Sequence, residues 1–211
     1  MSRGKFIALE GGEGTGKSTQ CRLLAEALAK RGIATDITRE PGGTPGAEAI
    51  RTMLLDPPGE GWGAQAEALL FAAARSDHVI TRIEPSLEAG RWVICDRFVD
   101  SSRAYQGGAG GLGDETITAL HQIGSRGLRP DCTVLIDVPA EVTAARLAER
   151  DAGNSDAIGG RGTEYHAAVR QTFLELAERD PGGFVVIDGD AGPDAVHDRI
   201  MAALEPLLAA A

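Results

Sequence analysis

The feature of this sequence that most restricts its fold is a glycine-rich segment directly after a short apolar run. Residues 6–9 are apolar, and residues 11–18 then read GGEGTGKS. These eight residues fit the pattern G-x-x-x-x-G-K-[ST], which forms a phosphate-binding loop when a strand precedes it and a helix follows. An amphipathic pattern over residues 17–30 supplies that helix. The segment therefore predicts an α/β domain that binds a nucleotide.

Each residue type in this loop has a chemical reason. Glycines let backbone N–H groups converge on phosphate oxygens, and the helix that follows adds the positive end of its dipole. Lys17 is expected to reach the β- and γ-phosphates, and the Ser18 hydroxyl to ligate Mg²⁺. The expected ATP-binding residues are the whole loop and the residue after it: Gly11, Gly12, Glu13, Gly14, Thr15, Gly16, Lys17, Ser18 and Thr19.

Short apolar runs alternate with helical patterns along the rest of the chain. The runs are rich in β-branched and aromatic residues and cover 6–9, 35–38, 92–95, 133–136 and 184–187. The helical patterns cover 17–30, 47–55, 64–78, 115–126, 142–150, 164–179 and 194–208. This alternation predicts a five-stranded parallel sheet with helices on both faces. Pro57 and Pro58 should end the second helix, and Pro85 should interrupt the segment after residue 78.

Two glycine-rich stretches break the pattern. Residues 106–113 contain five glycines, and residues 151–163 are polar and glycine-rich. Both are expected to be connections, because this composition is typical of loops. No internal repeat and no linker divides the sequence, so residues 1–211 are expected to form a single domain.

Composition restricts the partners. Asp and Glu outnumber Lys and Arg by 31 to 21, which gives a net charge of −10 and excludes a general binder of nucleic-acid backbone. The three cysteines have no metal-ligand spacing and indicate a reducing compartment. The apolar run near the start is too short for a signal peptide, and the longest run, 68–74, falls far short of the ~20 residues that cross a bilayer. We therefore expect a cytoplasmic protein without membrane or nucleic-acid partners.

A phosphate-binding loop identifies the nucleotide but not the reaction, because switch GTPases, ATP-driven motors and small-molecule kinases share it. A switch GTPase would carry an Asn-Lys-x-Asp guanine-binding sequence after a later strand, and this sequence has none. A nucleic-acid motor would need more basic surface. The remaining interpretation is a kinase with a small acceptor.

The acceptor side is expected at the end of the third strand, where Asp96 and Arg97 stand. In open α/β sheets, ligands bind beyond the carboxyl ends of the strands. A carboxylate there can hold Mg²⁺ through water, and an arginine fork suits a phosphate. Alone, such a pair is equally typical of a surface ion pair, so both interpretations stay open at this point.

Three motifs together closely resemble the bacterial thymidylate kinase family. They are GGEGTGKST (11–19), TREPGGT (38–44) and DRFVDSSRAYQG (96–107). The last matches every fixed position of the family pattern: Asp-Arg-aromatic, two residues, Ser-Ser, one residue, then Ala-Tyr-Gln. The resemblance extends from the first strand through the helix that contains Tyr165. It implies a three-layer P-loop kinase fold with a short lid at about 151–163, ATP as phosphoryl donor, Mg²⁺, dTMP as acceptor, and a homodimer packed through helices.

The resemblance also implies which residues bind dTMP: Glu13, Glu40, Arg51, Phe71, Arg75, Arg97, Ser102, Tyr105 and Gln106. Two of them, Arg51 and Arg97, would grip its phosphate, while Asp96 would assist Mg²⁺ placement beside Ser18. Glu13 would accept a hydrogen bond from the sugar 3′-hydroxyl.

The remaining matches concern the base and the sugar. Phe71 would stack on thymine and Arg75 would hydrogen-bond its edge, and their spacing of four residues independently puts both on one helical face. Tyr105 would lie against the deoxyribose where a 2′-hydroxyl would clash. Ser102 and Gln106 would reach the base, and Glu40 would lie near the sugar. Without the resemblance, Phe71 in its apolar run would be interpreted as a core residue.

Phosphoryl transfer requires cations that neutralise the moving γ-phosphoryl group, and the loop lysine and Mg²⁺ supply two of them. The third is an arginine, which some family members carry in the loop; residues 12–15 here include none. The alternative is a lid arginine, although residues 156–159 read Asp-Ala-Ile-Gly in place of the family's Asp-Arg-x-Glu. The candidates are Arg150, Arg161 and Arg146, with Arg150 preferred and Arg146 alternatively near the adenine. The implied catalytic residues are thus Lys17, Arg97, Arg150 and Arg161.

Two rival functions remain at this point. A deoxynucleoside kinase can also carry an Asp-Arg pair after a strand, but it deprotonates a 5′-hydroxyl and needs a carboxylate base there, whereas two arginines favour a phosphorylated acceptor. A nucleotide-binding regulator that performs no phosphoryl transfer is the other, because the lid departs from the family pattern.

Overall fold

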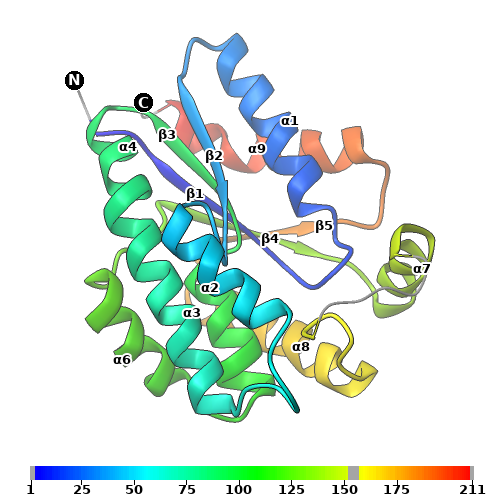
Figure 1. The fold of residues 1–211 in the computed structure, drawn as a ribbon. Coiled ribbons are helices and arrows are strands. Elements are labelled where there is room, and N and C mark those ends of the chain that lie inside the picture. Colours follow the sequence, from blue (N-terminus) through cyan, green and yellow to red (C-terminus); the bar gives the residue numbers. More distant parts are fainter. Residues whose placement is uncertain (1–2, 152–156, 210–211) are drawn as a thin grey trace.

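The chain folds around one parallel sheet of five strands in the order β2-β3-β1-β4-β5. The computed structural model describes residues 3–151 and 157–209, and the side chains of 149–151 lie outside that description. The strands are β1 (Phe6–Glu10), β2 (Thr35–Arg39), β3 (Trp92–Asp96), β4 (Cys132–Asp137) and β5 (Phe184–Asp188). Figure 1 shows β1 at the centre of the sheet, between β3 and β4.

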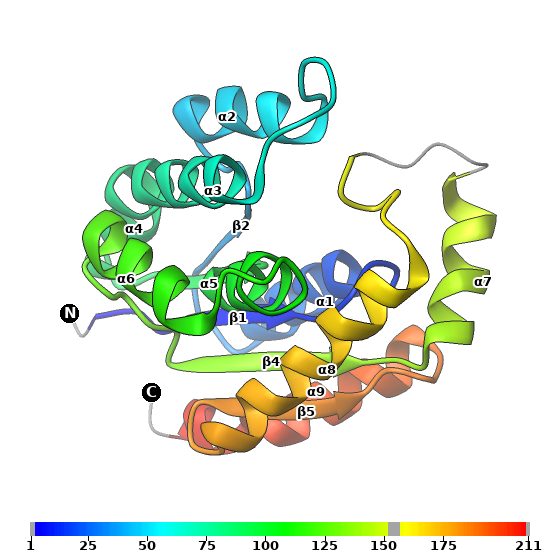
Figure 2. The same ribbon diagram turned by 90° about the horizontal axis from the view of Figure 1, so that it is seen from below.

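Helices cover both faces of the sheet, as predicted. Helices α1 (Lys17–Lys30) and α9 (Pro193–Ala209) pack on one face, and the other face is covered by α4 (Glu84–Glu88), α5 (Val99–Ser102) and α8 (Thr163–Arg179) (Figures 1 and 2). Alternation along β1 explains this layering: Ile7 and Leu9 join the α1 and α9 side, whereas Phe6 and Ala8 join the opposite side. Because both faces of the central strands are buried, their sequences are continuously apolar.

Three helices lie further from the sheet. Helices α2 (Pro45–Leu55) and α6 (Asp114–Ser125) pack on the flanks of α3 (Ala64–His78), and α7 (Ala140–Asp151) follows the end of β4 (Figure 2). Thr44 caps α2 by accepting a hydrogen bond from the N–H of Ala47 at 3.2 Å. No helix within residues 3–151 and 157–209 is long and apolar enough to cross a membrane.

Every strand is longer than predicted by one polar or charged residue at its carboxyl end. The added residues are Glu10, Arg39, Asp96, Asp137 and Asp188, and β4 also begins one residue earlier, at Cys132. Backbone pairing continues where the apolar pattern stops, because ladder hydrogen bonds do not depend on side-chain polarity. These polar ends lie at one edge of the sheet, and two of them, Arg39 and Asp96, line the pocket described below.

Two predicted breaks in helical structure are wrong. Pro85 does not interrupt the segment after residue 78: α3 continues through the π-helical segment η1 (Val79–Ile83) into α4, and Pro85 lies in the first turn of α4. Proline is tolerated there because the π-helical turn already displaces the regular hydrogen bonds. The stretch 106–113 begins inside a second π-helical segment, η2 (Arg103–Ala109), although glycine disfavours helix. Segment η2 is held by packing against α6 and α8.

Candidate active site

A cavity of about 560 Å³ opens at the carboxyl ends of the strands. One end is formed by the loop between β1 and α1, and the other by α2, α3, α5 and η2. The lining includes nearly every residue predicted for the two substrates: Glu13, Gly14, Gly16, Lys17, Ser18, Thr19, Glu40, Arg51, Phe71, Arg75, Asp96, Arg97, Ser102, Tyr105 and Gln106. Segments far apart in the sequence therefore meet in one pocket.

The glycine-rich loop is shaped by positive backbone dihedrals. Gly11, Gly14 and Gly16 have φ values of 140°, 72° and 93°. A Cβ at Gly11 would lie 2.5 Å from the carbonyl oxygen of Ile136 at the next strand, so only glycine fits. Glycine is thus required at position 11 by both its dihedral and the space around it.

Lys17 is buried inside its own loop. Its ammonium group donates to the carbonyl oxygens of Gly12 at 2.7 Å and Gly11 at 3.2 Å. Burial lowers the pKa of Lys17, and the nearby guanidinium of Arg97 lowers it further. A phosphate between these two cations would reverse that effect, since an anion favours the charged form of lysine.

Ser18 and Asp96 are adjacent although 78 positions separate them in the sequence: the Ser18 Oγ donates to Asp96 Oδ2 at 2.5 Å. A hydroxyl and a carboxylate side by side are hard oxygen ligands of the kind that Mg²⁺ takes together with substrate phosphates. Among the described residues there is no group of three or more His, Cys, Asp or Glu able to hold a metal by themselves. The pair therefore fits a metal shared with a phosphate, rather than a metal cage made by protein alone.

Arg97 lies at the junction of the loop and the acceptor side. Its guanidinium donates to Glu13 Oε1 at 2.6 Å, to the Gly11 carbonyl at 2.9 Å and to the Tyr105 hydroxyl at 3.2 Å. The residue has a φ of 71°, in the left-handed region that non-glycine residues seldom adopt. This backbone conformation occurs directly after the end of β3. Non-glycine residues in this region carry backbone strain, and such residues cluster at active sites and ligand-binding sites.

Glu10, which the sequence reasoning left aside, organises the same turn. The carboxylate is fully buried and accepts from the N–H groups of Phe98 at 2.8 Å and Ser101 at 3.0 Å, and from the Ser101 hydroxyl at 2.6 Å. Burial, together with Asp100, raises the pKa of Glu10 to about 7. The sequence gives little indication of this role, because an acidic residue at the end of a strand is equally typical of a surface charge.

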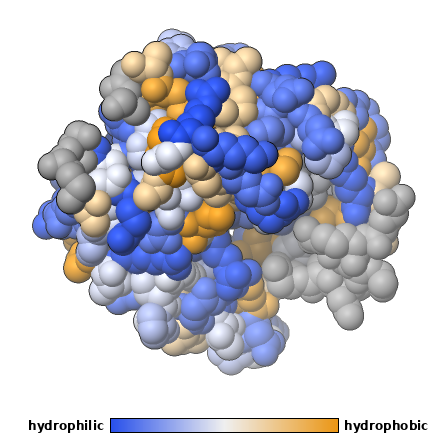
Figure 3. Space-filling view, turned by 90° about the horizontal axis from the view of Figure 1, so that it is seen from above, coloured by the Kyte–Doolittle hydropathy of each residue, from blue (hydrophilic) through white to orange (hydrophobic). Residues whose placement is uncertain are grey.

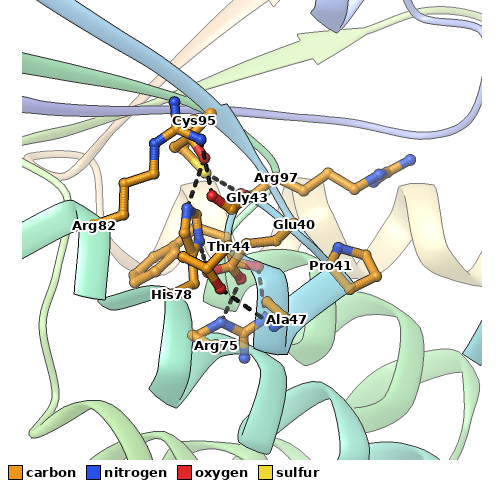
Figure 4. Close-up of polar contacts among 12 residues, drawn as sticks. Glu40, Pro41, Gly43, Thr44, Ala47, Arg75, His78, Arg82, Cys95 and Arg97 are labelled. Atoms are coloured by element: carbon orange, nitrogen blue, oxygen red, sulfur yellow. Dashed lines mark hydrogen bonds and ion pairs between the residues drawn. The ribbon is translucent and has the colours of Figure 1, made fainter. Parts of the chain in front are cut away.

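Arg75 has its guanidinium fixed by groups from two other segments. Its Nε donates to Glu40 Oε2 at 2.7 Å, and its Nη2 donates to the Ser102 hydroxyl at 2.9 Å. The opposite oxygen of Glu40 faces His78 Nδ1 at 3.0 Å, so Glu40 lies between the two side chains of α3 (Figure 4). All of these groups are buried. The carboxylate of Glu40 is therefore committed to aligning Arg75.

His78 completes this network, although nothing in its local sequence indicates such a role. It is fully buried, and its Nε2 lies 2.7 Å from the Thr38 hydroxyl. Because Nδ1 faces a carboxylate, it donates to Glu40, and the second ring nitrogen shares a hydrogen bond with the Thr38 hydroxyl. Gly43 closes over the pair, since a Cβ there would lie 2.5 Å from both His78 Nε2 and Thr38 Oγ1 (Figure 4).

The remaining acceptor residues line the same end of the pocket. Arg51 donates to the carbonyl oxygen of Pro41 at 2.7 Å. Phe71 lines the pocket and also packs in a hydrophobic cluster with Tyr105, so the core and binding interpretations of Phe71 are compatible. Gln106 is buried and donates from its Nε2 to Glu67 Oε1 at 2.8 Å.

The structure separates the three candidate arginines near the lid. Arg146 lines the pocket and donates to the Gly189 carbonyl at 3.1 Å. Arg161 pairs with Glu67 and donates to the Tyr165 hydroxyl at 2.6 Å. Arg150 lies in the last turn of α7, and its side chain is outside the described residues, as are lid residues 152–156.

The comparisons with known proteins point to one family. The family model described as thymidylate kinase matches residues 9–200. The thymidylate kinase of Rhizorhabdus wittichii is 53% identical over 205 residues, which cover 97% of this chain and 99% of the relative. The corresponding enzymes of Rhodopseudomonas palustris and Bradyrhizobium diazoefficiens are 50% and 45% identical, covering 99% and 98% of this chain and 94% and 91% of theirs. The chain therefore belongs to the thymidylate kinase family.

Proposed function

We propose that this chain transfers the γ-phosphoryl group of ATP to dTMP and forms dTDP and ADP. The observation that carries this proposal is the single cavity that joins a phosphate-binding loop to a cluster of arginines beyond β3. Arg51 and Arg97 line its acceptor end, and two guanidinium groups suit a phosphorylated acceptor better than a neutral hydroxyl.

The donor side is assigned to residues 11–19. Lys17 exchanges its carbonyl partners for the β- and γ-phosphates, and the backbone N–H groups of the loop bind the remaining oxygens. Ser18 and Asp96 hold Mg²⁺, which supplies charge neutralisation for the phosphates when bound. Their 2.5 Å contact supports this assignment.

The acceptor side is assigned to residues from four segments. Arg97 and Arg51 hold the dTMP phosphate, and Glu13 accepts from the sugar 3′-hydroxyl. Arg75, aligned by Glu40, donates a hydrogen bond to the thymine edge. The other assigned contacts are Phe71, Ser102, Tyr105 and Gln106, all of which line the pocket.

The attacking atom is an oxygen of an already ionised phosphate, so little general-base help is needed. Catalysis then depends on alignment of the two phosphates and on cations around the moving group. We assign Arg150 as the arginine that completes these cations, with Arg161 as the alternative. Replacing each arginine by Ala distinguishes the two assignments. Loss of the catalytic arginine lowers kcat, whereas loss of the other arginine leaves kcat intact.

We also propose that the chain forms one domain that pairs as a homodimer. Support comes from three exposed apolar side chains on adjoining elements: Leu69 on α3, Ile80 on η1 and Ile123 on α6, which are 56%, 54% and 83% exposed. By contrast, the face seen from above in Figure 3 is largely hydrophilic, with apolar residues in small separate groups. Large exposed apolar side chains on elements that pack together are typical of an interface.

The test is ADP release from Mg-ATP with dTMP, dUMP, dCMP, thymidine, AMP and GMP offered one at a time. Strong turnover with dTMP and little with thymidine is the expected result. Turnover with thymidine in place of dTMP would make the chain a deoxynucleoside kinase and would overturn the assignments of Arg51 and Arg97. Slow ADP release that is indifferent to every acceptor would identify a nucleotide-binding regulator.

A further inference from the structure

Glu67, a residue with no assigned role, lies behind the acceptor end of the pocket. It is on α3, one turn before Phe71, and is only 7% exposed. One carboxylate oxygen accepts from Gln106 Nε2 at 2.8 Å, and the other accepts from Arg161. Glu67 thus contacts a residue of the pocket wall with one oxygen and a residue of the expected lid segment with the other.

The contact between Glu67 and Gln106 fixes which end of the Gln106 amide faces the carboxylate. An ionised carboxylate only accepts hydrogen bonds, so it holds the NH₂ end of the Gln106 amide toward α3. The carbonyl end of the same amide is therefore turned away from Glu67. Without such a contact, a side-chain amide rotates by half a turn at little cost. The rotation would replace the carbonyl acceptor by the NH₂ donor at the pocket wall.

Arg161 keeps this carboxylate in place. Its guanidinium pairs with Glu67, donates to the Tyr165 hydroxyl at 2.6 Å and stacks over the Tyr165 ring at 4.8 Å. The Tyr165 hydroxyl in turn donates to the carbonyl oxygen of Tyr105 at 2.9 Å, next to Gln106 in the chain. The positive charge offsets the cost of burying Glu67, and the stacking fixes the guanidinium.

From this geometry we infer that Glu67 is the positioning residue that sets base selectivity, by fixing the orientation of the Gln106 amide. The inference rests on the proposed function. A fixed carbonyl oxygen accepts from the N3–H of thymine or uracil, whereas cytosine presents a bare acceptor at N3 and is repelled. Arg161 is the counter-charge of Glu67.

The experiment compares kcat/KM for dTMP, dUMP and dCMP in wild type and in Glu67→Gln, which keeps the volume but offers either end of an amide to Gln106. We expect the dTMP-to-dCMP ratio to fall at least tenfold. The dTMP-to-dUMP ratio should stay within twofold, because these two bases share the same hydrogen-bonding edge. Loss of packing alone would not separate the two ratios.

Three variants complete the design. Glu67→Asp keeps an acceptor-only group and should retain the wild-type preference for dTMP over dCMP. Glu164→Gln, an exposed acid on α8, is the matched control and should change neither ratio. Gln106→Ala removes the amide itself and must lower the dTMP-to-dCMP ratio, which keeps the inference testable if Glu67→Gln does not fold.

The outcomes separate the inference from the proposed function. Wild type without dTMP turnover overturns the proposed function. Wild type with dTMP turnover, and an unchanged dTMP-to-dCMP ratio in Glu67→Gln or Gln106→Ala, overturns only the inference. Arg161→Ala removes the counter-charge of Glu67 and should raise KM for dTMP. A hundredfold fall in its kcat with KM unchanged would place Arg161 among the catalytic cations and contradict its role as counter-charge.

Discussion

At the scale of single residues, the chain keeps several ionisable groups away from water, and His121 shows the consequence most clearly. Its ring is 4% exposed and packs edge-on against Phe98, with ring centroids 5.5 Å apart. Nε2 donates to the Leu128 carbonyl at 2.7 Å, and Nδ1 is buried without a hydrogen-bond partner among the described residues. Protonating Nδ1 would create an unpaired buried charge, and burial, aided by Arg75, lowers the pKa of His121 to about 4.

This pKa predicts a loss of stability in mild acid. The unfolded chain takes up a proton at His121 below about pH 6.5, whereas the folded chain does so only near pH 4, so stability is full above pH 6.5 and falls toward pH 4. At about 1.4 kcal/mol per pKa unit, the loss is about 3 kcal/mol. His121→Gln, which can still donate to Leu128, should flatten that part of the curve. Urea unfolding from pH 4 to 8 checks it, and parallel curves for variant and wild type would contradict the assignment.

The residues that align the site were harder to predict than those that line it. Lys17, Arg97, Tyr105 and Gln106 belong to contiguous motifs, so spacing and resemblance were enough to propose them. Glu10 and Glu67 act through partners 88 and 39 positions away, and nothing in their local sequence indicates those contacts. Long-range hydrogen bonds depend on the tertiary arrangement and carry no local pattern.

At the scale of elements, periodicity predicted the strands and most helices, and it failed where tertiary packing outweighs propensity. Helices α1 and α3 have the predicted bounds. Segment η2 could not be predicted, because its glycines disfavour helix and its stability comes from α6 and α8, which lie further along the chain. Segment η2 contributes Tyr105 and Gln106 to the pocket, which agrees with the frequent use of such turns at functional positions.

The loop between β2 and α2 offers a test of how packing and backbone strain add. Gly43 has a φ of 92°, and its missing Cβ leaves room for the His78–Thr38 pair. Gly59, in the loop between α2 and α3, serves as the comparison, because it has a φ of 61° and open space around it. Gly59→Ala should cost about 1 kcal/mol from strain alone. Gly43→Ala should cost about 2–4 kcal/mol, because a clash of about 1–3 kcal/mol is added. It should also raise KM for dTMP, since the clash displaces Glu40 and Arg75.

Denaturant unfolding and steady-state kinetics of the two variants check this prediction. Equal losses of stability in Gly43→Ala and Gly59→Ala would mean that the loop moves away without cost. A normal KM for dTMP in Gly43→Ala would show that the Thr38–His78–Glu40 network does not align Arg75.

At the scale of the whole molecule, the proposed homodimer predicts that one surface charge separates the subunits. Ile123→Asp puts a charge at the most exposed apolar side chain of the proposed interface and should give monomers in sedimentation at micromolar concentration. Ile37→Asp, on edge strand β2, carries the same change at a side chain that is 43% exposed and should leave the dimer intact. A dimer that persists in Ile123→Asp would rule out this face as the interface.

The order of the strands also has a consequence for how the chain is made. Strand β1 is synthesised first, yet its two neighbours end at Asp96 and Asp137, far later in the chain. At about 5–20 residues per second, the ribosome needs on the order of 4–17 s after β1 before β3 exists. During that interval the apolar residues 6–9 have no strand to pair with on either side, which is the condition under which nascent chains aggregate. The strand before the phosphate-binding loop is thus made first of the five and stays unpaired for the longest time. The yield of folded protein therefore depends on the contacts that cover this strand during synthesis.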